Sequence, residues 1–99
     1  MDYVSALKSA ISAASTVSPE RGSGCGRIYV IPSSEHKRGL KAAAKKLGVI
    51  WTDKTYGIGA SSLYVGYDNC TGKELAKGTA MVAALKAHGI DCYRDEVAD

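Results

Sequence analysis

Apolar residues recur along the chain at two spacings, which predict alternating helices and strands. In residues 3–17 they recur every three or four positions, which indicates an amphipathic helix that ends before Pro19. The same spacing over Leu40–Leu47 and over Leu75–Leu85 predicts two further helices. Short β-branched and aromatic runs between them predict four strands: Ile28–Ile31, Val49–Tyr56, Ser62–Tyr67 and Ile90–Arg94.

Capping and turn residues mark where these elements begin and end. Ser33 or Ser34 can accept the free N–H groups at the start of the second helix, and Gly48 supplies its left-handed C-terminal position. The run Thr71-Gly72-Lys73-Glu74 has the form of a capping box with Thr71 as the N-cap of the third helix. Gly89 ends that helix, and Gly57-Ile58-Gly59 predicts a turn between the second and third strands.

After the first helix the predicted order is β-α-β-β-α-β, and its two halves resemble each other. With right-handed crossovers, this order predicts an α+β, ferredoxin-like sandwich with an additional N-terminal helix. Its antiparallel sheet has strand order 4-1-3-2, and both later helices lie on one face. The predicted organisation is an amphipathic helix at 1–18, a glycine-rich linker at 19–26 and the ferredoxin-like domain at 27–99.

Composition narrows the class of protein. The chain has 99 residues, of which 45% are hydrophobic and 23% charged, which is typical of one globular domain. No apolar run reaches the roughly 20 residues that span a bilayer, and the first eighteen residues do not resemble a signal peptide. We therefore expect no membrane partner and a cytoplasmic location. The odd cysteine count, Cys25, Cys70 and Cys92, predicts free thiols, and we expect no metal site and no cofactor.

The net charge is +3, and the basic residues gather in the middle of the chain while the last residues are acidic. Lys37, Lys41 and Lys45 stand four residues apart on one face of the second helix, flanked by Arg38 and Lys46. Like charges at this spacing cost helix stability, about 0.2–0.5 kcal/mol per pair. One interpretation is a docking patch that binds phosphates or an acidic protein surface. The other is a solvated helix face without a partner. Arg27 adds a cation to the first strand.

Alternation along the strands turns Tyr29 and Tyr64 to the sheet face away from the helices, where Tyr93 joins them. Here the sequence resembles the RNA recognition motif family. Ile28-Tyr29-Val30 is similar to its first signature and Tyr64-Val65-Gly66-Tyr67 to the end of its second, although Ala60-Ser61-Ser62 departs from that second signature. The resemblance implies that Tyr29 and Tyr64 stack on bases.

The stripe Val4, Leu7, Ile11 and Ala14 on the first helix needs an apolar surface to cover it. We expect this helix to dock on the open sheet face, which would make the tyrosines core residues. The alternative is a homodimer in which residues 3–17 cover a second copy.

Catalytic motifs do not stand out. Gly66–Lys73 has the wrong spacing for a phosphate-binding loop, and Ser33, Ser34 and His36 lack an orienting acid. We expect a non-enzymatic module that binds nucleic acid or a ribonucleoprotein through the basic helix, with the tyrosine face as a second contact. The alternative is a protein-binding inhibitor or adaptor that blocks an acidic protein surface. In its small size, its single domain and its lack of motifs, the chain is similar to small phage-encoded inhibitors such as anti-CRISPR proteins. An enzyme remains open only if a phosphate site lies beside Ser33 and Ser34.

Overall fold

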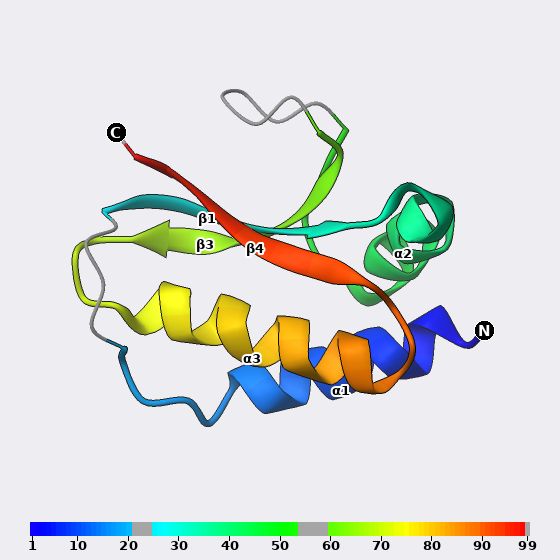
Figure 1. The fold of residues 1–99 in the computed structure, drawn as a ribbon, viewed down its shortest axis with the longest axis horizontal. Helices are drawn as coiled ribbons and strands as arrows, with labels where there is room; N and C mark the ends of the chain where they lie inside the picture. Colours follow the sequence, from blue (N-terminus) through cyan, green and yellow to red (C-terminus); the bar gives the residue numbers. More distant parts are fainter. Residues whose placement is uncertain (21–24, 54–59, 99) are drawn as a thin grey trace.

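The computed structural model describes residues 1–20, 25–53 and 60–98. Over this part the chain is an α+β protein in which three helices accompany a four-stranded antiparallel sheet of order β2-β3-β1-β4 (Figure 1). The elements are α1 (Tyr3–Ala14), β1 (Gly26–Pro32), α2 (Ser34–Leu47), β2 (Trp51–Thr52), β3 (Ser62–Asp68), α3 (Lys73–Ala87) and β4 (Cys92–Ala98).

The sheet places β1 and β3 at its centre, as the strand order predicted from the sequence requires. Counted from the β4 edge the order is 4-1-3-2, and the arrangement is compatible with a ferredoxin-like sandwich. The fourth strand begins two residues later than predicted, because the N–H of Ile90 closes the end of α3 by donating to the carbonyl of Leu85 at 3.0 Å. The second strand is shorter than predicted, and its predicted end, together with the turn at 57–59, lies outside the described residues.

The position of α1 differs from the expectation. It packs against α3 and α2 on the helix-bearing side of the sheet, so the expected docking on the open face is wrong (Figure 1). The helix packs there because its buried side is rich in alanine, whose small side chains let neighbouring helices approach closely. Ala6, Leu7 and Ala10 are fully buried within one chain, while Ile11 is 40% exposed. The helix therefore needs no second copy to cover it.

The contact between α1 and α2 is made by an aromatic ring lying on a glycine. Any Cβ at Gly39 would overlap the ring of Tyr3, so only glycine admits this packing. The Tyr3 hydroxyl forms a hydrogen bond of 2.9 Å with Nδ1 of His36. This contact fixes the first turn of α1 against the first turn of α2.

We predict that Tyr3→Phe lowers the free energy of unfolding by about 1 kcal/mol, because it removes one partly buried hydrogen bond but keeps the ring. Chemical denaturation measures the change, with Ser12→Ala on the exposed side of α1 as the control. Equal stability of Tyr3→Phe and the parent would contradict a role for this bond.

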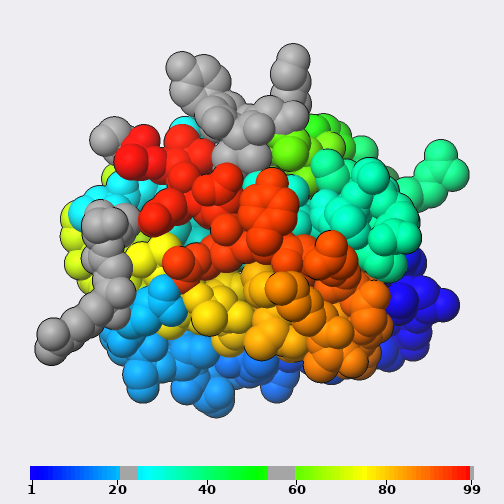
Figure 2. Space-filling model, in the orientation of Figure 1, coloured from blue at the N-terminus to red at the C-terminus, as the bar shows by residue number. Residues whose placement is uncertain are grey.

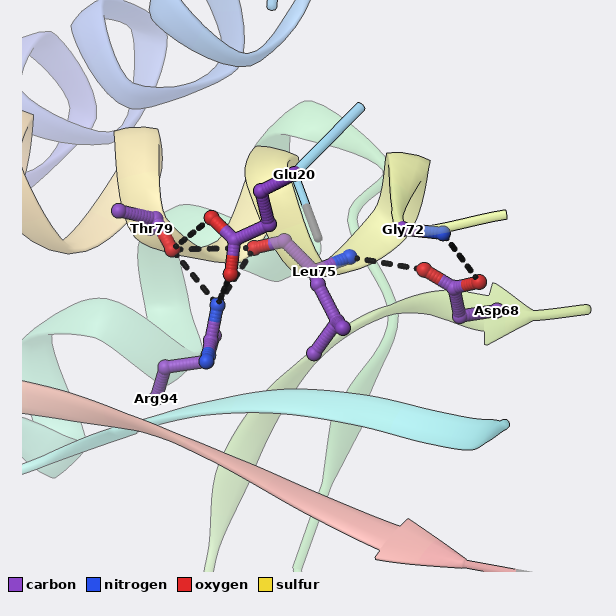
Figure 3. Close-up of polar contacts among 6 residues, drawn as sticks. All are labelled: Glu20, Asp68, Gly72, Leu75, Thr79 and Arg94. Carbon is purple, nitrogen blue, oxygen red and sulfur yellow. Dashed lines mark hydrogen bonds and ion pairs between the residues drawn. The ribbon is translucent and has the colours of Figure 1, made fainter. Parts of the chain in front are cut away.

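The start of α3 is capped by a residue that the sequence analysis did not single out. The predicted capping box is wrong, because the N-cap position is held by Gly72 in a left-handed conformation. The carboxylate of Asp68, at the end of β3, accepts hydrogen bonds from the N–H groups of Thr71, Gly72 and Leu75 at 2.8, 3.0 and 3.1 Å. Figure 3 shows the contacts with Gly72 and Leu75. Glu74, the other half of the predicted box, instead pairs with Lys77 at 3.3 Å.

The chain before β1 is also held to α3. Glu20 donates its N–H to the carbonyl of Gly72, and its carboxylate pairs with Arg94 and accepts the hydroxyl of Thr79 (Figure 3). Arg94 also donates to the carbonyl of Leu75 at 3.1 Å. The predicted linker at 19–26 is therefore anchored at Glu20 and ends inside β1, while residues 21–24 lie outside the described residues.

Two cysteines predicted to be free thiols form a disulfide. Cys25 directly precedes β1 and Cys70 follows β3, and the register pairs Gly26 with Asp68. Because these strands are paired, the two Cα atoms lie 4.5 Å apart. Cys92 is buried and free, and burial raises the pKa of its thiol to about 11.

Candidate functional site

The basic residues predicted to form a docking patch lie together on α2. Leu40, Ala43 and Ala44 are buried, so the opposite side of the helix faces solvent. What we call the cationic face consists of Lys37, Arg38, Lys41, Lys45 and Lys46, of which Lys37 is half-buried and the other four are exposed. In Figure 2, residues of α2 form the surface at one end of the molecule. The helix has 14 residues, so the cationic face is at most about 20 Å long.

The charges of the cationic face are largely uncompensated. Lys41 pairs with Asp53, whereas the other four cations have no ion-pair partner among the described residues. Lys45 and Lys46 lie in the last turn of α2, where the helix dipole favours a cation. Lys37 lies in its first turn, where the dipole disfavours a cation. Helix stability alone therefore does not account for the whole row.

A polar cluster lies at the border of the cationic face, between α2 and the end of β2. The Lys41 ammonium lies 2.6 Å from Oδ1 of Asp53, and the indole N–H of Trp51 donates to the same oxygen at 3.0 Å. The hydrogen bond from Lys41 holds the pKa of Asp53 below its usual range. The sequence analysis did not single out Asp53, because β2 pairs with β3 and contacts α2 only in the folded chain.

The predicted tyrosine pair forms, but it is not an open platform. Tyr29 and Tyr64 are register partners on β1 and β3, with ring centroids 5.4 Å apart. Tyr29 is only 4% exposed and Tyr64 is half-buried. A base cannot stack on the buried ring of Tyr29 without displacing what covers it.

The remaining predicted contact residues are dispersed. Tyr93 is 53% exposed on β4, opposite Ile31, and Asp95 lies opposite Tyr29 on the same sheet face. That carboxylate would repel a phosphate backbone along the tyrosines. Arg27 lies near the start of β1, while α2 follows the end of β1, so Arg27 does not join the cationic face.

Ser33 and Ser34, beside which a phosphate site was considered, are the N-cap and the first residue of α2. Ser33 is the N-cap residue, yet its side chain makes no capping hydrogen bond, and its hydroxyl lies 3.5 Å from Oε1 of Glu35. The carboxylate of Glu35 in the first turn opposes an anion at this helix N-terminus. His36 is already engaged by Tyr3.

A cavity of about 300 Å³ opens between α1, α3 and β3. Its lining is mostly apolar and consists of Ile11, Ala14, Ser15, Val49, Tyr64, Val65, Lys77 and Met81. The Lys77 ammonium at its edge is paired with Glu74 at 3.3 Å, so the cavity offers no unpaired charge to a ligand. No residue of the cationic face lines this cavity.

Within the described ranges, no group of three or more histidine, cysteine or acidic side chains is arranged to hold a metal ion. None of the helices in the described part of the chain is long and apolar enough to cross a membrane. Comparison with protein families, with curated proteins and with solved structures finds no match to this chain.

Proposed function

We propose that this protein is a non-enzymatic binding module that engages the phosphate backbone of nucleic acid, free or within a ribonucleoprotein, through the cationic face of α2. The observation that carries the proposal is a set of five cations on one helix, four of them exposed and one, Lys37, half-buried; only Lys41 has an ion-pair partner among the described residues. Such a row favours a dense polyanion, because each neutralised phosphate releases a condensed counterion.

The contact we propose is to the backbone rather than to the bases. Tyr29 is buried beside Tyr64, and Asp95 shares their sheet face. Base stacking of the kind that the RNA recognition motif resemblance implies needs exposed rings. The cationic face has no such requirement, and phosphate contacts carry no sequence information by themselves. We therefore expect binding that depends weakly on nucleotide sequence.

We also propose a fold type and a cellular location for this protein. We infer a ferredoxin-like sandwich from the strand order and from helices on one side of the sheet. The cytoplasmic location stays a prediction, and the Cys25–Cys70 disulfide weighs against it, because disulfides persist mainly in oxidising compartments. The oxidation state of this pair in the cell is therefore informative about the compartment.

We predict that the triple substitution Arg38→Gln, Lys45→Gln, Lys46→Gln weakens binding to nucleic acid by a factor on the order of a hundred at low salt. The plot of log affinity against log salt should also become shallower by about 2–3, since each lost phosphate contact contributes nearly one to the slope. Fluorescence anisotropy with labelled duplex and single-stranded DNA and RNA at several salt concentrations measures both quantities.

The matched control replaces three exposed cations elsewhere, Lys8→Gln, Lys73→Gln and Lys86→Gln, which changes the net charge equally. This control should lose far less affinity than the α2 variant. Equal losses would reduce the effect to net charge, and no saturable binding by the parent protein at low salt would refute the proposal. In that second case the cationic face becomes a candidate surface for an acidic protein, as the inhibitor alternative requires.

A further inference from the structure

Lys41, at the centre of the cationic face, is the one of its cations that has an ion-pair partner among the described residues. Oδ1 of Asp53 lies 2.6 Å from its ammonium, and the indole of Trp51 holds the same oxygen from the other side. The carbonyl of Asp53 accepts the hydroxyl of Ser61 at 2.6 Å, so the backbone of this acid is also held. Asp53 is thus positioned on Lys41 rather than meeting it by chance.

The bridge between Lys41 and Asp53 is exposed and open to competition. The two side chains are 54% and 68% exposed, so water screens their attraction. A carboxylate oxygen at this distance from an ammonium takes the place that a phosphate oxygen would take. A duplex presents one negative charge about every 1.7 Å along its axis, which is far denser than the charge on a protein surface.

Resting on the proposed function, we propose that Asp53 is a built-in competitor for the phosphate backbone, and that binding exchanges its carboxylate for a phosphate oxygen on Lys41. While the bridge is closed, the cationic face is one charge weaker toward every anion. A nucleic-acid backbone can offset the free energy lost in opening the bridge, because its neighbouring phosphates contact Arg38 and Lys45 at the same time. Sparse carboxylates do not, so Asp53 favours nucleic acid over acidic protein surfaces.

The test compares Asp53→Asn with the parent protein on a labelled DNA duplex across a salt series. Asparagine keeps an oxygen that accepts the Trp51 N–H but lacks the charge that holds Lys41. We expect binding two- to fivefold tighter with a nearly unchanged salt slope, because Lys41 contacts a phosphate in both complexes but starts unpaired only in the variant. Glu96→Gln is the control, since Glu96 is an exposed acid on β4 and its loss changes the net charge equally.

A second measurement places the effect on Lys41. Lys41→Gln should weaken binding more in the Asp53→Asn background than in the parent. In the parent, Lys41 must give up its bridge to Asp53 to contact a phosphate, so its net contribution to binding is smaller. Additive effects of the two substitutions would contradict the exchange. So would an Asp53→Asn protein that behaves like Glu96→Gln.

Trp51 is the single tryptophan of the chain, so its indole N–H gives one resonance that reports on the bridge. Addition of duplex should shift this resonance in the parent protein, because its acceptor oxygen loses Lys41, and should shift it less in Asp53→Asn. An unmoved resonance at saturation would overturn the exchange while leaving the proposed function intact. Absence of duplex binding by the parent would overturn the proposed function itself.

Discussion

Reduction of the Cys25–Cys70 disulfide is expected to lower the free energy of unfolding by about 4 kcal/mol. The bridge closes a loop over a sequence separation of 45 residues, and the chain-entropy estimate for a loop of that length gives this value. The effect is large for a 99-residue domain, whose total stability is on the order of 5–15 kcal/mol. Denaturant titration with and without a thiol reductant measures it.

The double variant Cys25→Ser, Cys70→Ser provides the matched control. It should be as unstable as the reduced parent and should not respond to the reductant. Cys92 does not complicate the comparison, because burial raises the pKa of its thiol to about 11 and keeps it in the unreactive form. Thiol titration of the unfolded parent should find one free thiol before reduction and three after it. Three thiols before reduction, with a stability that the reductant does not change, would show that the pair is not bonded.

Replacement of Asp68 by alanine is expected to cost about 2–4 kcal/mol of stability. This fully buried carboxylate accepts hydrogen bonds from three N–H groups at the start of α3, and alanine would leave the buried N–H groups of Gly72 and Leu75 without an acceptor. Asp68→Asn should cost less, because it keeps one acceptor oxygen. Asp2→Ala, which removes the exposed cap of α1, should cost only about 1 kcal/mol. A loss from Asp68→Ala no larger than that from Asp2→Ala would contradict the role given to Asp68.

Asp68 also predicts a pH dependence. Burial opposes its ionisation, but the N–H groups of Leu75, Gly72 and Thr71 outweigh burial and hold its pKa below the usual value. A carboxyl whose pKa is lower in the folded state adds stability above its unfolded pKa, near 4, and that stability is lost as the pH falls through the folded pKa. The stability difference between the parent and Asp68→Asn should therefore shrink below about pH 4. A difference that stays constant down to pH 2 would contradict this assignment.

The cations of the cationic face could be predicted from the sequence, but the bridge from Lys41 to Asp53 could not. The row of cations follows from helical spacing alone, since Leu40, Ala43 and Ala44 define the buried side and the lysines must take the other. The bridge to Asp53 does not follow, because nothing in the sequence brings the end of β2 beside α2. The same holds for Tyr29, whose face could be assigned from alternation while its burial could not.

By itself the sequence determined the elements and their order, because periodicity, glycines and prolines act on neighbouring residues. It indicated where α2 stops, at left-handed Gly48, and which side of α2 is charged. Only the tertiary structure decided where α1 packs and which residues meet across long separations. The pairing of Glu20 with Arg94 and the hydrogen bond between Tyr3 and His36 join residues that are far apart in the sequence. Such contacts carry no local pattern, because each requires the rest of the fold to bring its two partners together.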